Sequence, residues 1–170
     1  QGTDRGLYDL NTFTTDEAML PTRGGDWYDG GLWENLFLHN WGTKNDLVKG
    51  SWDYLYKVIA QANQSLDKLK EILENNPENI SVPKYISEVR AFRAMYYYYL
   101  LDMFARVPLV TSSSVAMEDV VQSERSAVFN FVRTELEESV EDLSDAHSNL
   151  TGEYYGRITK PVAYFLLAKL

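Results

Sequence analysis

The 170-residue sequence contains no cysteine and only two histidines, His39 and His147, which lie far apart. Without cysteine the sequence has no disulfide, no thiolate zinc site and no cysteine nucleophile. A histidine metal cage or a serine-histidine-aspartate triad could use only one of the two histidines, and neither has the spacing of a zinc motif. We therefore expect no bound metal and no cofactor.

Basic residues are also scarce, since 16 lysines and arginines stand against 25 acidic residues, which gives a net charge of −9 and a pI near 4.7. A nucleic-acid partner requires a basic face that displaces counterions, so this class of partner is disfavoured. Residues 118–145 hold nine of the acids and two arginines. We interpret this cluster as the solvated face of a helix, with an acidic binding surface as the alternative.

Long apolar runs are missing as well: none approaches the ~20 residues needed to span a bilayer, and the first residues lack the basic and apolar segments of a signal peptide. The aromatic content, by contrast, is high, with 12 tyrosines, seven phenylalanines and four tryptophans. A disordered chain would not have this much apolar surface to bury. The length permits one folded core rather than two.

Apolar residues recur at steps of three and four in four segments, which is typical of helices with one buried face. We expect helices over 44–73, from Ser81 to about 104, from about 123 to 143, and from 161 onward. A hydroxyl side chain precedes three of these helices and is expected to cap the helix N-terminus: Ser81, Ser123 and Thr159. Residues 107–110, which include a proline, should be extended.

The second of these helices is the most aromatic. Its expected buried stripe consists of residues three and four apart: Ile86, Val89, Phe92, Tyr96, Tyr99, Leu100 and Met103. Residues 95–100 are apolar or aromatic all round, which indicates packing on more than one side. Arg90 and Arg93 interrupt this surface, and we expect them to satisfy acids or helix ends in the core rather than to contact a ligand.

The two ends of the sequence differ in character. The first 45 residues are broken by glycines and a proline, yet they hold three of the four tryptophans, and we expect Trp33 and Trp41 to belong to the core. In the last helix the expected apolar stripe is Val162, Phe165, Leu166 and Leu170. Because the sequence stops while this stripe continues, we expect the chain to be the opening part of a larger all-helical protein built from antiparallel helix pairs.

The second helix also carries a motif. Residues 88–100 read EVRAFRAMYYYYL, and VPLV follows at 107–110. This run closely resembles the SusD/RagB family of Bacteroidetes outer-membrane nutrient-binding lipoproteins, although Ala105 and Arg106 stand where glycine and aspartate are usual. Three further segments match motifs of the family in the same order: Thr15 to Glu17, Trp52 to Asn63, and Gly156 to Leu170.

The resemblance implies an all-α, SusD-like fold of tetratricopeptide-like helix pairs with long N-terminal loops, of which residues 1–170 are the N-terminal portion, truncated at the C-terminus. Residues 1–45 would form a loop-rich ligand-binding region, and residues 46–170 a helical repeat region. The resemblance also implies a lipid-bearing cysteine upstream of Gln1, a place on the surface of the outer membrane, and a SusC-like TonB-dependent transporter on which the protein sits as a lid.

A sugar presents hydroxyls and a flat apolar C–H face, so a capture site combines an exposed aromatic plane with polar side chains. The glycine-rich segment 23–31 has this composition. The predicted ligand-binding residues are Arg23, Asp26, Trp27, Tyr28 and Asp29. The segment follows Thr15 to Glu17, as the aromatic platform does in glycan-binding family members, so the resemblance makes Trp27 the platform. Packing within the loop is the alternative role of Trp27.

These observations favour a non-catalytic protein that captures glycans or oligosaccharides at the cell surface and delivers them to the transporter. Peptide capture by a member of the same family is one alternative, and an intracellular tetratricopeptide-like scaffold that binds peptides is another. A glycosidase would need two well-placed carboxylates. Asp26 and Asp29 lie in a glycine-rich loop without an evident rigid frame, which argues against an enzyme.

Overall fold

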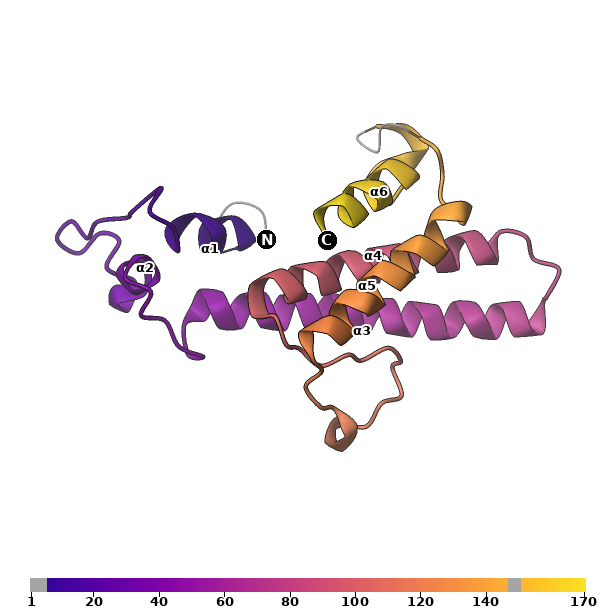
Figure 1. Ribbon diagram of the computed structural model, residues 1–170, viewed down its shortest axis with the longest axis horizontal. Coiled ribbons are helices and arrows are strands. Elements are labelled where there is room, and N and C mark those ends of the chain that lie inside the picture. The colour runs from indigo at the N-terminus through magenta and orange to yellow at the C-terminus, as the bar shows by residue number, and fades with distance from the viewer. Residues whose placement is uncertain (1–5, 147–150) are drawn as a thin grey trace. The chain divides into compact units, whose positions relative to one another are not determined.

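The computed structural model describes residues 6–146 and 151–170, so that His147 lies outside the described residues (Figure 1). The described residues contain six α-helices and no strand, which confirms the all-α prediction: α1 Leu7–Phe13, α2 Leu32–Phe37, α3 Asp46–Asn75, α4 Val82–Phe104, α5 Arg125–Ser139 and α6 Lys160–Lys169. The chain divides within α3 into two compact units, Gln1–Tyr54 and Leu55–Leu170. Among the described helices, none has the length and apolarity that crossing a bilayer requires.

The helices lie close to the predicted ranges, but the predicted caps differ. Ser81 and Thr159 do occupy the residues before α4 and α6, yet neither side chain makes a capping hydrogen bond, and α5 follows Glu124 rather than Ser123. At α4 an asparagine performs this role instead. The Asn79 Oδ1 accepts hydrogen bonds from the backbone N–H groups of residues 81 and 82, at 3.0 and 3.2 Å, because its carbonyl reaches the same unpaired donors that a cap satisfies.

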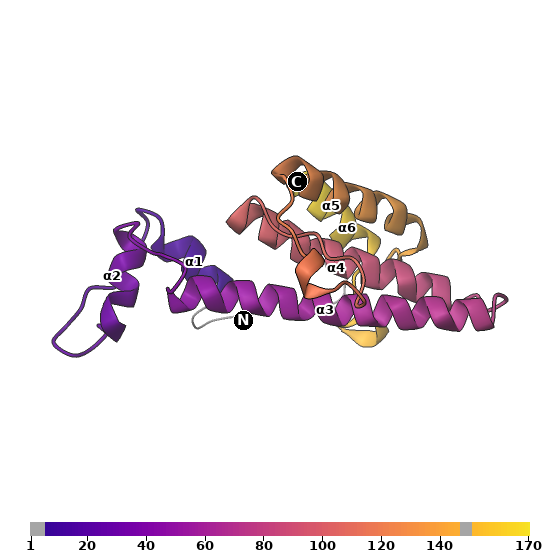
Figure 2. The same cartoon turned by 90° about the horizontal axis from the view of Figure 1, so that it is seen from below.

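In the second unit, α4 packs against α5 and contacts α6, and Figure 2 shows it between these helices and α3. The core is made by apolar side chains from all four helices: Leu55, Ile59, Leu66, Ala91, Ala94, Tyr97, Leu100, Val128, Val132, Leu136, Ala163 and Leu166. Small residues of α4 lie at the centre, because an alanine lets a neighbouring helix approach closely.

The predicted stripe of α4 is therefore displaced around the helix. Only Leu100 of that stripe is buried, while Ile86, Val89, Phe92, Tyr96, Tyr99 and Met103 are half-buried. The expectation that α4 packs on more than one side explains the difference, since large side chains flank the contact that its alanines make. In α6 the prediction for Phe165 was wrong: its side chain is 62% exposed, and Ala163 and Leu166 are the buried residues.

A buried ion pair joins three helices of the second unit. The Nη2 of Arg93 donates to the Oε2 of Glu135 at 2.5 Å, and its Nη1 donates to the Oδ1 of Asn63 at 2.8 Å and to the carbonyl of Thr111 at 3.0 Å. Arg90 donates to the other oxygen of Glu135 from Nε and Nη2, at 3.0 and 2.8 Å. The prediction that both arginines pair with acids is confirmed.

In the segment that follows α4, Pro108 forms an isolated antiparallel bridge with Gln122, which agrees with the predicted extended backbone. This segment is bound to the helices through its backbone. The Tyr97 hydroxyl donates to the carbonyl of Val110 and accepts from its N–H, at 2.9 and 2.8 Å, while Asn63 donates to the same carbonyl at 2.8 Å. The Tyr56 hydroxyl donates to the carbonyl of Pro108 at 2.8 Å. Burial raises the pKa of Tyr97 to about 12.

We expect Glu135→Gln to lower the free energy of unfolding by about 3–5 kcal/mol, because it leaves the buried Arg93 guanidinium without its counter-charge. Chemical denaturation of the full-length protein measures this change. Glu137→Gln on the same helix is the matched control, since Glu137 is exposed and lies 3.9 Å from Arg133, and it should cost less than about 0.5 kcal/mol. Equal losses in the two variants would show that the buried pair contributes no more than a surface pair.

We expect Ala105→Gly to stabilise the protein by about 1 kcal/mol. Ala105 ends α4 with φ 60° and ψ −71°, and the N–H of Arg106 donates to the carbonyl of Phe104 at 2.7 Å, which is a tight turn that strains a residue with a Cβ. A higher denaturation midpoint with an unchanged slope would agree with this reading. A lower midpoint for Ala105→Gly would contradict it.

Candidate ligand-binding site

The glycine-rich loop, residues 23–31, begins with a tight turn. The backbone N–H of Arg23 donates to the carbonyl of Asp26, and the N–H of Asp26 donates to the carbonyl of Arg23, both at 3.0 Å. Gly24 takes φ +65° between them, a conformation that a side chain would strain. The side chains of Arg23 and Asp26 are exposed and form no ion pair with any described residue. Both can therefore reach a ligand at the surface.

Trp27 follows this turn and is 53% exposed, although its ring is supported from one side. The ring packs edge-on against Trp33, with centroids 6.1 Å apart and planes at 70°. Trp33 is only 3% exposed and packs in turn against Phe13, at 5.3 Å and 74°. The prediction that Trp33 belongs to the core is confirmed. One tryptophan is therefore buried, and it holds the other in an exposed position.

Asp29 connects the same loop to α2. Its Oδ2 accepts a hydrogen bond from the Nε1 of Trp33 at 2.8 Å, four residues further along the chain. Asp29 therefore helps to fix the loop. Tyr28, between Asp29 and Trp27, is 55% exposed. The structure thus places the five predicted residues in one exposed loop, with Trp27 and Asp29 both anchored on Trp33.

Trp41 does not belong to the core, contrary to the prediction from the sequence. Its side chain is 41% exposed, and its ring lies edge-on to His39, with centroids 5.4 Å apart and planes at 79°. His39 has φ +54°, and its Nε2 lies 2.8 Å from the carbonyl oxygen of Thr14. Phe37 and Leu38 lie four and three residues before Trp41, so the spacing of apolar residues held no signal that this ring is exposed.

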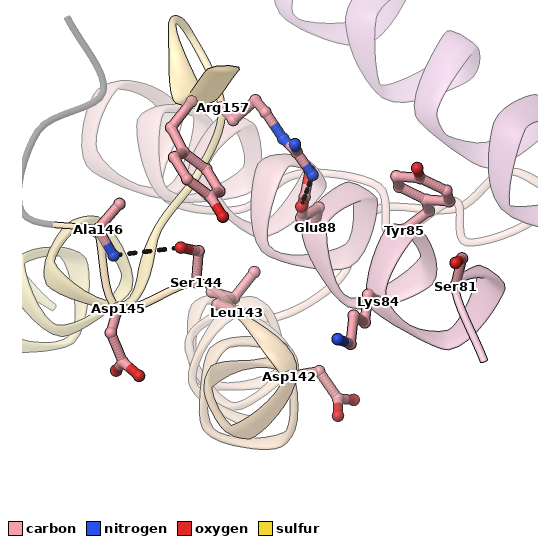
Figure 3. Close-up of a pocket in the computed structure, with 11 residues that line it drawn as sticks. Ser81, Lys84, Tyr85, Glu88, Asp142, Leu143, Ser144, Asp145, Ala146 and Arg157 are labelled. Atoms are coloured by element: carbon pink, nitrogen blue, oxygen red, sulfur yellow. Dashed lines mark hydrogen bonds and ion pairs between the residues drawn. The ribbon is translucent and has the colours of Figure 1, made fainter. Parts of the chain in front are cut away.

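The second unit contains a cavity of about 560 Å³ beside the first turns of α4 (Figure 3). Its walls come from three segments: Ser81, Lys84, Tyr85 and Glu88; Asp142 to Ala146; Tyr154 and Arg157. The Nε of Arg157 donates to Glu88 at 3.1 Å, and its Nη2 donates to the other carboxylate oxygen. These hydrogen bonds raise the pKa of Arg157. Because the bond between Arg157 and Glu88 connects two of the segments that line it, we interpret this cavity as a junction between segments.

The described ranges hold no group of three or more histidine, aspartate or glutamate side chains close enough to share an ion. The loop of the first unit offers different chemistry. It presents two exposed aromatic rings, a guanidinium and carboxylates, which can stack on a sugar and exchange hydrogen bonds with its hydroxyls. The described chain is thus all-helical, and its first unit presents exposed aromatic rings on the glycine-rich loop.

Comparison with known proteins identifies the family. Residues 6–170 match the SusD-like family described as "Starch-binding associating with outer membrane", and the chain belongs to this family. A SusD-like protein of Bacteroides ovatus is 23% identical over 172 residues, which cover 98% of this chain and 30% of that protein. SusD-like protein P38 of Formosa agariphila is 28% identical over 121 residues, which cover 69% of this chain and 23% of that protein. The chain thus spans less than a third of the length of these relatives.

Solved structures show the same fold. A laminarin-binding SusD-like protein superposes with a TM-score of 0.76 and 27% identity, over 95% of this chain and 33% of that one. Surface glycan-binding protein A from Bacteroides fluxus superposes with a TM-score of 0.75 and 21% identity, over 96% of this chain and 33% of that one. The SusD-like fold that the sequence motifs predicted is confirmed.

Trp33→Ala should release the glycine-rich loop, because it removes both the support for Trp27 and the hydrogen bond to Asp29. We expect trypsin to cleave after Arg23 at least about tenfold faster in this variant, since cleavage requires the turn at Arg23 to open. Limited proteolysis followed by mass spectrometry measures the rate. Leu38→Ala is the control, since Leu38 is exposed at the end of the same helix. A cleavage rate equal to that of the control would show that Trp33 does not hold the loop.

Proposed function

We propose that the protein is a non-catalytic binding protein of the cell surface, which captures glycans or oligosaccharides and delivers them to a TonB-dependent outer-membrane transporter. One observation carries this proposal: the Trp27 side chain is half-exposed on the glycine-rich loop while its ring packs at 70° against the buried Trp33. The exposed half of the ring is apolar surface that a ligand can cover. The apolar C–H face of a sugar is the complementary surface.

The support beneath Trp27 favours binding because it lowers the entropic cost. A side chain that is immobilised on binding costs about 0.5–1.5 kcal/mol, and a ring already held by a neighbour loses less freedom. The ring of Trp33 and the hydrogen bond from Trp33 to Asp29 supply this restraint. Arg23 and Asp26 flank the platform with exposed polar groups, which can exchange hydrogen bonds with vicinal hydroxyls.

The relatives support a carbohydrate as the ligand. The family is described as starch-binding and associated with the outer membrane, and the structural relative with 27% identity is a laminarin-binding protein. Both descriptions name neutral glucans. We propose the same class of ligand for this protein, together with the family's setting: a lipid anchor upstream of Gln1, the outer-membrane surface, and a SusC-like transporter as partner.

The carboxylates of the loop support binding without catalysis. A glycosidase uses one carboxyl group as an acid and a second as a nucleophile or base, and both must face the scissile bond. Asp29 accepts the hydrogen bond of Trp33, so this carboxylate already helps to hold the loop. Asp26 is exposed in the preceding turn, so it lacks the apolar surroundings in which a glycosidase holds its general acid.

The test is calorimetric titration of the full-length protein with laminarin, soluble starch, alginate and casein-derived peptides. We expect a neutral glucan to bind, and Trp27→Ala to weaken that binding at least about tenfold, which corresponds to 1.4 kcal/mol. Tyr8→Ala is the matched control, since Tyr8 is an exposed aromatic residue of α1 outside the loop. Binding of peptides alone, or full glucan affinity in Trp27→Ala, would overturn the proposal.

A further inference from the structure

Asp29 and Gly30 are the single pair in the sequence in which an aspartate or asparagine precedes a glycine. Such a pair has its own chemistry. The backbone nitrogen of the glycine can attack the side-chain carbonyl carbon of the aspartate, because glycine has no Cβ that crowds this nitrogen. Every other aspartate or asparagine is followed by a residue with a side chain, which hinders the same attack.

The structure places this pair at the centre of a tight turn in the glycine-rich loop. The N–H of Gly31 donates to the carbonyl of Tyr28 at 2.6 Å, which closes the turn around residues 29 and 30. Asp29 has φ 39° and Gly30 has φ 68°, the positive values that a mirror-image turn requires at both central residues. Both residues are exposed, and no atom from elsewhere in the described chain lies within 4 Å of where a Cβ of Gly30 would be. Packing therefore leaves the approach to the Gly30 nitrogen open.

One contact restrains the Asp29 side chain. Its Oδ2 accepts the hydrogen bond from the Nε1 of Trp33 at 2.8 Å, so the carboxylate is held toward α2. Trp33 is 3% exposed and packs against Phe13, so the donor stays in place when the carboxylate moves. The side chain must leave this donor before it can turn toward the Gly30 nitrogen. The rate of attack therefore depends on how often this hydrogen bond opens.

We propose that Asp29 is a site of spontaneous modification, which converts it to isoaspartate through a cyclic imide, and that the hydrogen bond from Trp33 sets the rate. In the first step the Gly30 nitrogen bonds to the Cγ of the protonated Asp29 side chain and loses its proton, while the carboxyl hydroxyl leaves as water. In the second step water opens the imide. Cleavage at Cγ restores aspartate, whereas cleavage at the main-chain carbonyl carbon leaves the chain running through Cγ. One water leaves and one returns, so water is the only co-reactant.

The product cannot retain the contacts of Asp29. The main chain gains one carbon atom, and the free carboxylate is now attached directly to Cα, which is too short to reach the Nε1 of Trp33 as the original side chain does. The former Asp29 carbonyl, which accepts the N–H of Leu32, becomes part of that carboxylate. We therefore expect the modification to release the loop and to open the turn at Arg23 to proteolysis.

The experiment compares Asp29 with Asp26 in the same molecule. The full-length protein is incubated at neutral pH and then digested with trypsin, whose cuts after Arg23 and Lys44 leave both aspartates in one peptide. Electron-transfer fragmentation in a mass spectrometer identifies isoaspartate at each position. We expect it to accumulate at Asp29 and not at Asp26, which is exposed in the same loop but precedes Trp27. Folded protein without isoaspartate at Asp29, after a time in which urea-unfolded protein has formed it there, would overturn the proposal.

Trp33→Phe tests the restraint, because phenylalanine retains an aromatic ring and lacks the donor. We expect isoaspartate to form roughly threefold to tenfold faster in this variant, the factor that corresponds to the net contribution of one hydrogen bond. Trp52→Phe is the matched control, since it makes the same substitution on α3. Equal rates in the two variants would show that the hydrogen bond does not set the rate.

If circular dichroism shows that Trp33→Phe fails to fold, the wild-type protein decides the role of the restraint. Slower formation of isoaspartate in the folded than in the urea-unfolded protein supports it, and equal rates overturn it. Trypsin should then cleave intact modified protein after Arg23 faster than unmodified protein, and equal cleavage would overturn the release of the loop. None of these measurements uses a glycan, so their outcome is independent of the proposed function.

Discussion

The second unit depends on the buried contact between Arg93 and Glu135. Isolated charges of this kind would be costly to remove from water, and further hydrogen bonds offset much of this cost: Arg93 also donates to the Asn63 side chain and the Thr111 carbonyl, and Glu135 also accepts from Arg90. These partners come from α3, α4, α5 and the segment after α4. A contact of this type contributes little net stability relative to an apolar core, but breaking it leaves a buried charge without its partner. The contact therefore favours the arrangement in which these four segments meet.

The candidate site of the first unit is built on a different principle. Its elements are short, with seven residues in α1 and six in α2, and such helices are marginal without tertiary contacts. Contacts between aromatic rings take the place of the long helix–helix contacts of the second unit. Phe13 packs against Trp33, and Trp33 packs against Trp27. Each ring buries a large area and restricts the next. This arrangement explains how a loop with five exposed polar and aromatic residues can retain one conformation.

The features of this protein that depend on periodicity could be predicted from the sequence. Features that depend on which neighbouring side chain makes a particular contact could not. The ranges of α3 and α4, the buried Trp33 and the pairing of Arg90 and Arg93 with acids were all accessible from spacing and charge. The caps were not, because Asn79 reaches the N-terminus of α4 from two residues before Ser81. The buried face of α4 differs from the predicted stripe because the helix makes its closest contacts at small alanine residues rather than at its large apolar side chains. Trp41 was misassigned because a large apolar side chain does not reveal whether a neighbour will cover it.

Backbone strain marks the positions where the two exposed tryptophans are oriented. Four described residues other than glycine have positive φ, and three of them lie in the first unit: Trp27 at 60°, Asp29 at 39° and His39 at 54°. Such conformations cost on the order of 1–3 kcal/mol each and persist only where surrounding contacts impose them. Contacts with Trp33 hold the backbone conformations of Trp27 and Asp29, and the contact with the Thr14 carbonyl holds that of His39. If these residues served stability alone, glycine at each position would relieve the strain. The strain is instead retained where Trp27 and Trp41 are exposed, and the contacts that impose it hold both rings in place.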